Sequence, residues 1–278
     1  MSQEIRESIL QFGEPEPGNE KRLLGILARP SQPDPTLPVI VIPNTGFEHR
    51  VGPNRLHVQI SRALAAAGYY VLRFDLGGLG DSSPPVGHAA SMVKDSQLAM
   101  DALDKLKLGR NYLFIGLCSG ANDAHQTARV DERIVGMFCL DGHAFESPRF
   151  RQLRLKKRLL HPWRSLRNVI ARWLPQFRAH QSMGSQGAEA EIIVWPSKQQ
   201  VEADYQLFLD RQMHMAFFFT GDIQSVYLYA EQHYDVFPML RGWAPVWFLP
   251  HIDHTLTRRA AREEMIAHIH KWLSSLKD

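Results

Sequence analysis

The segment GLCSG, residues 116–120, constrains the fold of this chain more than any other part of it. It follows an apolar run, NYLFIG, that is typical of a buried strand, and it opens a run with helical spacing. A strand can turn directly into a helix only where the residues two before and two after the turn are small. Gly116 and Gly120 meet that requirement around Cys118. The register does not fit Ser119, whose corresponding neighbours are leucine and alanine.

The five residues also have a second interpretation. A glycine-rich turn at a helix N-terminus can bind phosphate through backbone N–H groups, and Cys118 would then be a small buried side chain. The rest of the chain has to decide between the two interpretations.

Strands and helices alternate along most of the sequence, and the first two strands, which are joined by a polar turn, are expected to form an antiparallel pair. The remaining strands predict a mostly parallel sheet with right-handed crossovers. The predicted strands are 5–12, 22–29, 38–43, 69–75, 111–116, 134–141, 214–221 and 246–249. The predicted helices are 57–68, 91–106, 118–130, 223–233 and 255–276.

The alternation stops between residues 145 and 213, where three helical stretches and a linker-like loop replace it. A chain of 278 residues is long enough for one large domain and does not require two. We therefore predict one α/β core, residues 1–144 and 214–278, interrupted by a helical insertion at 145–213.

Three further segments, together with GLCSG, resemble the α/β-hydrolase superfamily, and the resemblance covers nearly the whole chain outside the insertion. Residues 43–47 (PNTGF) resemble its oxyanion loop, and residues 74–82 (FDLGGLGDS) resemble its D-x-x-G-x-G-x-S turn. Residues 253–255 (DHT) resemble the site of its catalytic histidine. The resemblance implies an α/β-hydrolase fold with the insertion as a helical lid. It also implies a nucleophilic Cys118, as in dienelactone hydrolases and polyhydroxyalkanoate synthases.

The resemblance implies a general base, and His254 is the expected one because it lies in the loop after the last predicted strand. His251, His268 and His270 are nearby alternatives, but the last two fall inside the final predicted helix.

Two aspartates remain open as the acid of a Cys-His-Asp triad. Asp222 follows the strand after the insertion, and Asp141 ends the strand before it. The family often places its acid a few residues beyond a glycine, where this chain has Gln224. A helix cap for Asp222 and a turn residue for Asp141 are the structural alternatives.

Two backbone N–H groups are expected to bind the oxyanion: that of Ser119, and that of either Phe47 or Gly46. Arg50 and Arg55 follow this loop directly. They are candidates for binding a substrate carboxylate or phosphate, and the alternative is a salt bridge that orders the loop.

The insertion is strongly basic, because residues 149–178 carry ten arginines and lysines and no acidic residue. Apolar residues recur among them at a spacing of three and four, which predicts amphipathic helices with a cationic face. The apolar face, with Trp163 and Trp173, is expected to shape the substrate pocket. The cationic face has three interpretations: a solvated surface, a docking site for an acidic acyl carrier protein, or a contact with anionic lipid.

These features predict a hydrolase that cleaves an ester or thioester through an acyl-enzyme on Cys118. One alternative is an acyltransferase that passes the acyl group from a carrier-protein or CoA thioester to an amine, alcohol or thiol. The other is a non-catalytic binding protein of the same fold. We expect no cofactor and no metal, because HIDH at 251–254 lacks accompanying ligands and the glycines at 77–80 lack dinucleotide-binding spacing.

Charge and composition set the remaining expectations. A net charge of +3 does not indicate a nucleic-acid-binding protein. Two cysteines, Cys118 and Cys139, do not suggest a disulfide framework. The first residues lack the features of a signal peptide, and no run is apolar enough to span a membrane. We therefore expect a cytoplasmic protein with free thiols.

Overall fold

The computed structural model describes residues 5–13, 15–16, 19–20, 22–84, 92–160 and 195–276. The strands are β1 (Arg6–Phe12), β2 (Pro15–Glu16), β3 (Asn19–Glu20), β4 (Leu23–Arg29), β5 (Val39–Ile42), β6 (Val71–Asp75), β7 (Tyr112–Leu117), β8 (Ile134–Leu140), β9 (His214–Thr220) and β10 (Val246–Leu249). The α-helices are α1 (Leu56–Ala66), α2 (Met92–Lys105), α3 (Ser119–Val130), α4 (Pro148–Leu160), α8 (Lys198–Asp210), α9 (Gln232–Val236) and α10 (Arg259–Ser275). Short 3₁₀ turns are η1 (Pro53–Arg55), η2 (Gly221–Ile223) and η3 (Pro238–Leu240).

Eight strands form one sheet in the order β1-β4-β6-β5-β7-β8-β9-β10. The six strands from β6 to β10 in this order are parallel to one another, whereas β4 is antiparallel to β6 and β1 to β4. Every residue of β5 and β7 is buried, as expected of central strands that are covered on both faces. The predicted antiparallel pair and the mostly parallel sheet are both confirmed.

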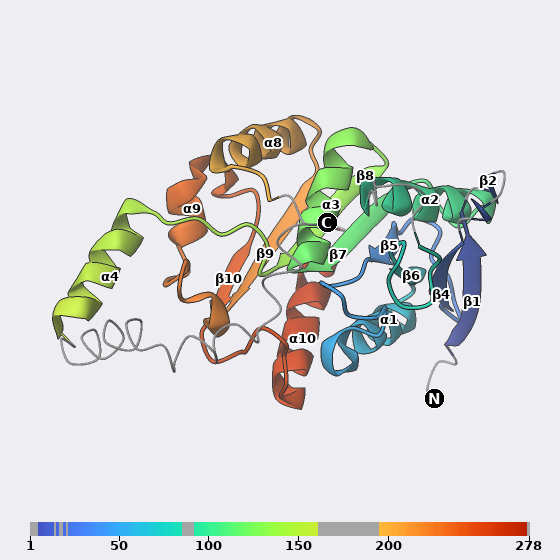
Figure 1. The fold of residues 1–278 in the computed structure, drawn as a ribbon, viewed down its shortest axis with the longest axis horizontal. Coiled ribbons are helices and arrows are strands. Elements are labelled where there is room, and N and C mark those ends of the chain that lie inside the picture. Colours follow the sequence, from blue (N-terminus) through green and yellow to red (C-terminus); the bar gives the residue numbers. More distant parts are fainter. Residues whose placement is uncertain are drawn as a thin grey trace.

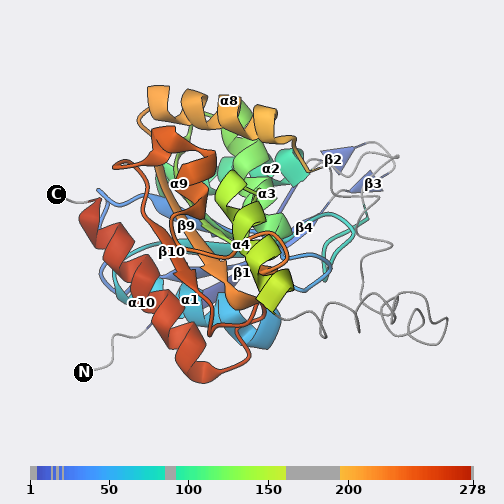
Figure 2. The ribbon, with the colours of Figure 1, turned by 90° about the vertical axis from the view of Figure 1, so that its left-hand side faces the viewer.

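Helices cover both faces of the sheet (Figures 1 and 2). On one face α1 and α10 pack together, and their apolar residues form one buried cluster with the strands. On the other face α2, α3 and α8 lie over a second cluster. Val201, Tyr205 and Phe208 of α8 belong to this second cluster, so the last helix of the predicted insertion packs directly on the sheet layer.

Helix α4 differs from the others because it projects away from the two helix layers (Figure 1). Its Phe150 is buried, whereas Leu155 and Leu159 are 58% and 70% exposed. None of the described helices combines the length and the apolar character needed to cross a membrane.

Two predicted helices differ from the structure for identifiable reasons. Instead of a helix over 223–233, the chain forms turns followed by the short α9. The buried Gln232 side chain holds these turns by hydrogen bonds to Leu228 N–H and to the carbonyls of Val226 and Phe145. The final helix begins at Arg259 rather than at residue 255, because Leu256 has a left-handed φ of 49° that a helix cannot continue through.

The turn from β7 into α3 is as tight as the sequence predicts. Cys118 has φ 53° and ψ −113°, outside the regions that non-glycine residues ordinarily adopt. A Cβ on Gly116 would lie 2.2 Å from the Gly120 carbonyl oxygen, and one on Gly120 would lie 2.6 Å from the carbonyl oxygen of Asn44. Both glycines are therefore required by close backbone approach.

Replacing Gly116 by alanine should lower the free energy of unfolding by about 3 kcal/mol, because rigid backbone atoms would have to move apart. Gly242→Ala is the matched control, since its new Cβ meets nothing within 4 Å and only its φ of 80° adds a cost of about 1 kcal/mol. Urea unfolding of both variants measures the difference. Equal losses would contradict the steric role of Gly116.

Candidate active site

Three side chains meet at the carboxyl edge of the sheet, where the loops after parallel strands converge. Cys118 follows β7, Asp141 follows β8, and His254 lies in the loop after β10. The thiol stands at the N-terminus of α3.

The His254 ring contacts Asp141. Its Nδ1 lies 2.7 Å from Asp141 Oδ2, and the Asp141 side chain is fully buried. The same carboxylate accepts hydrogen bonds from Thr220 N–H at 2.7 Å and from Thr220 Oγ1 at 2.6 Å. These bonds satisfy the buried carboxylate and hold it toward the imidazole.

Asp222 contacts the backbone of the same loop instead. Its Oδ2 accepts a hydrogen bond from His254 N–H at 2.8 Å. Of the two aspartates that the sequence leaves open, the structure brings Asp141 to the ring and uses Asp222 to hold the turn that carries the ring. The position after β8 therefore has the contact with the ring that a triad acid would need.

Hydrogen bonds to Asp141 and then to Cys118 raise the pKa of His254 to about 10, against the opposing effect of burial. The raised pKa favours the protonated ring at neutral pH, and the Cys118 side chain lies close enough to the ring to contribute to this shift. A protonated ring in this position can give its proton to a leaving group.

The alternative histidines lie elsewhere. His251 pairs with Glu264 at 3.0 Å on the surface. His268 and His270 are on α10, and burial lowers the pKa of both.

The loop expected to bind the oxyanion follows β5 and contacts the start of α3. Gly46 N–H donates to Ser119 Oγ at 2.5 Å, so this amide already has a partner. Phe47 N–H makes no hydrogen bond with a described residue, and its side chain is exposed. Of the two loop donors expected from the sequence, Phe47 is the one that the geometry leaves available.

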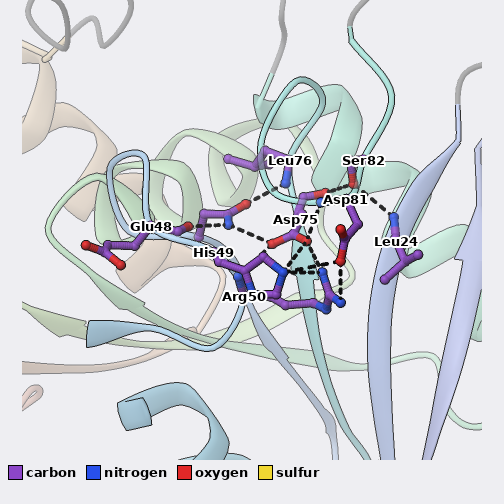
Figure 3. Close-up of polar contacts among 9 residues, drawn as sticks. Leu24, Glu48, His49, Arg50, Asp75, Leu76, Asp81 and Ser82 are labelled. Atoms are coloured by element: carbon purple, nitrogen blue, oxygen red, sulfur yellow. Dashed lines mark hydrogen bonds and ion pairs between the residues drawn. The ribbon is translucent and has the colours of Figure 1, made fainter. Parts of the chain in front are cut away.

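A buried ion pair fixes this loop from the other side (Figure 3). Asp75, at the end of β6, accepts from Arg50 N–H at 2.6 Å and from Asn44 Nδ2 at 3.1 Å, and it pairs with the Arg50 guanidinium. Arg50 also reaches Asp81 at 2.8 Å, and Asn44 Nδ2 donates to the Glu48 carbonyl at 2.7 Å. The geometry thus supports the loop-ordering alternative for Arg50.

The other predicted substrate-binding residues are Arg55, Trp163 and Trp173. Arg55 is exposed at the start of α1. Trp163 and Trp173 lie outside the described residues. The importance of Asn44 and Asp75 was missed in the sequence, although Asp75 belongs to the D-x-x-G-x-G-x-S segment that could have signalled it.

Within the described part of the chain, His49, Asp75 and Asp81 could offer ligand atoms within 4.8 Å of one another. The Arg50 guanidinium binds both of these carboxylates. A cationic side chain therefore takes the place that a metal ion would need, and the cluster acts as a brace for the loop.

Comparison with known proteins identifies the fold. No protein-family model and no curated protein matches the sequence. The esterase domain of a Rhodothermus marinus protein is 16% identical, with a TM-score of 0.56 over 96% of this chain and 97% of that chain. A Pyrococcus furiosus esterase is 14% identical, with a TM-score of 0.58 over 98% and 91%. An α/β hydrolase from a Penicillium species is 16% identical, with a TM-score of 0.54 over 97% and 98%. The chain has the α/β-hydrolase fold, as its sequence predicts.

Mutation should distinguish the contributions of the two aspartates to catalysis. Asp141→Asn should lower kcat on an activated ester by about 100-fold or more, because the amide cannot stabilise the imidazolium. Asp222→Asn should have a small effect by comparison, since the amide oxygen can still accept from His254 N–H. Steady-state kinetics of both variants measures the two values of kcat. A larger loss of kcat in Asp222→Asn than in Asp141→Asn would assign the role of the acid to Asp222.

Proposed function

We propose that the protein is a hydrolase that cleaves an ester or thioester through an acyl-enzyme intermediate on Cys118. The observation that carries this proposal is geometric: the His254 ring, whose Nδ1 lies 2.7 Å from the buried Asp141 carboxylate, lies beside Cys118 at the tip of a strained strand-to-helix turn. This arrangement has the nucleophile, the base and the orienting acid of a triad.

In the proposed acylation step, the Cys118 thiolate attacks the carbonyl carbon and forms a C–S bond. The carbonyl electrons move to oxygen, where Ser119 N–H and Phe47 N–H stabilise the charge. Collapse breaks the bond to the leaving group, which takes its proton from His254.

Deacylation reverses the roles. His254 removes a proton from water as the water attacks the thioester carbon. Collapse of the second tetrahedral intermediate releases the carboxylic acid and restores the Cys118 thiolate, with the proton on His254. If an amine, alcohol or thiol replaces water, the same steps give an acyltransferase, which is the alternative activity.

Brief incubation with a panel of acyl thioesters and activated esters should add one acyl mass to the protein, and Cys118→Ala should show no adduct. Intact-protein mass spectrometry measures both. The lifetime of the adduct in water, with and without amine or alcohol acceptors, separates hydrolysis from transfer. If the parent shows neither adduct nor turnover across the panel, the non-catalytic binding protein replaces this proposal.

We also propose that the acyl substrate arrives on an acidic carrier protein that docks on α4. Lys156 and Lys157 are exposed between the exposed Leu155 and Leu159, and Arg149 stacks over the Tyr229 ring at 4.6 Å. Mixed basic and apolar side chains on a projecting helix suit an acidic partner with an apolar patch.

Reversing both charges in Lys156→Glu/Lys157→Glu should reduce kcat/KM on carrier-bound acyl groups and leave a small thioester unaffected, because only the carrier touches α4. Lys105→Glu/Lys271→Glu, at exposed positions of α2 and α10, is the control, because it makes the same change of net charge away from α4. Unchanged turnover of the carrier-bound substrate would reject the docking proposal. If the Lys156→Glu/Lys157→Glu variant instead loses binding to vesicles of anionic lipid that the parent binds, α4 contacts a membrane surface rather than a carrier protein.

A further inference from the structure

The Ser119 side chain connects the two halves of the predicted oxyanion hole. Ser119 is the first residue of α3, directly after Cys118, and it is 5% exposed. Its Oγ accepts the Gly46 N–H hydrogen bond at 2.5 Å. The bond joins the helix that carries the thiol to a loop 73 residues earlier in the chain.

The other described contacts of this loop hold it at different places. Asp75 and Arg50 fix Asn44 and residues 48–50 to the end of β6. Thr45 Oγ1 lies 3.3 Å from Nε2 of the buried His57. A turn closed by Glu48 N–H and the Thr45 carbonyl at 2.9 Å encloses Gly46 and Phe47, and the bond to Ser119 joins this turn to α3 beside the thiol.

The geometry of the bond bears directly on oxyanion binding. One expected donor is the N–H of Ser119 itself, and the other is the N–H of Phe47, the residue after Gly46. Each donor is therefore attached to one end of the Gly46–Ser119 bond. The bond therefore couples the position of one donor to that of the other, and an oxyanion hole works only when its donors are held in place before the charge develops.

We propose that the Ser119 hydroxyl is a positioning residue that sets the spacing of the oxyanion donors for Cys118. This inference rests on the proposed function, because it concerns the same acyl-transfer site. Ser119→Ala would release the loop tip without unfolding the protein, since the half-buried Gly46 N–H can bond to water instead.

A trifluoromethyl ketone tests the spacing directly. The Cys118 thiolate adds reversibly to its carbonyl carbon, the C–S bond forms, and the carbonyl electrons become an oxyanion in the hole. Iodoacetamide is the companion probe, because it alkylates the same thiolate by displacing iodide and develops no oxyanion. A structural defect that disturbs Cys118 itself would slow alkylation, whereas a misplaced donor would not.

Ser119→Ala should weaken trifluoromethyl ketone binding by about 10- to 100-fold and lower kcat with little change in KM. Its rate of Cys118 alkylation should equal that of the parent. Ser119→Thr, which keeps the hydroxyl, should restore ketone binding.

Equal ketone affinity in Ser119→Ala and the parent would overturn the inference. Tighter binding or faster turnover in Ser119→Ala would also overturn it, by showing that the hydroxyl blocks the hole. Failure of the parent to form any ketone adduct would count against the proposed function itself, so the two failures are distinguishable.

Discussion

The close backbone approach at residues 116–120 is the constraint on which the rest of the site depends. A strand and a helix can be joined this tightly only if positions 116 and 120 are glycines. Cys118, midway between them, must then adopt strained backbone angles. The strain is held by the surroundings: Cys118 N–H donates to the Leu140 carbonyl at 2.8 Å, and the Cys118 carbonyl accepts from Ala121 N–H at 3.0 Å. The thiol is thereby placed at the start of α3 and beside the strand that leads to Asp141.

The two cysteines show how strongly position controls thiol chemistry here. Cys139 lies in β8, and burial raises the pKa of its thiol to about 12, so it stays protonated at neutral pH. Cys118 is partly exposed at a helix N-terminus and within hydrogen-bonding reach of His254. The loop that presents His254 is itself held by short-range bonds, because Asp253 accepts from Thr257 N–H at 2.9 Å and from Thr257 Oγ1 at 2.7 Å.

Local patterns in the sequence were enough to predict the sheet, the tight strand-to-helix turn at Cys118 and the loop that carries His254. Continuous apolar runs and close glycine spacing are short-range properties that a single sequence displays. The choice between Asp141 and Asp222 is different, because it depends on how neighbouring strands pair. Leu140 of β8 is paired with Phe218 of β9, and this register places Asp141 beside Thr220 and the His254 ring. Both aspartates simply follow a strand in the sequence, so periodicity could not separate them.

Side-chain partners across the fold were equally hidden from the sequence. Arg50 is 25 residues from the buried Asp75 that it pairs with, and Gly46 is 73 residues from Ser119. The turns before α9 form because a buried glutamine bonds to backbone groups, which overrides the helical spacing of that segment. Long-range hydrogen bonds thus determine which side chains are partners in the site, whereas the strands and helices that carry them are predicted from local sequence.

The most direct test of the account is the rate of iodoacetamide alkylation at Cys118, followed by peptide mass with Cys139 as the internal standard. At neutral pH, Cys118 should be alkylated much faster than Cys139, and His254→Ala should slow Cys118 while leaving Cys139 unchanged. Alkylation of Cys118 no faster than of Cys139, or a rate that does not depend on His254, would contradict the claim that Cys118 is an activated nucleophile.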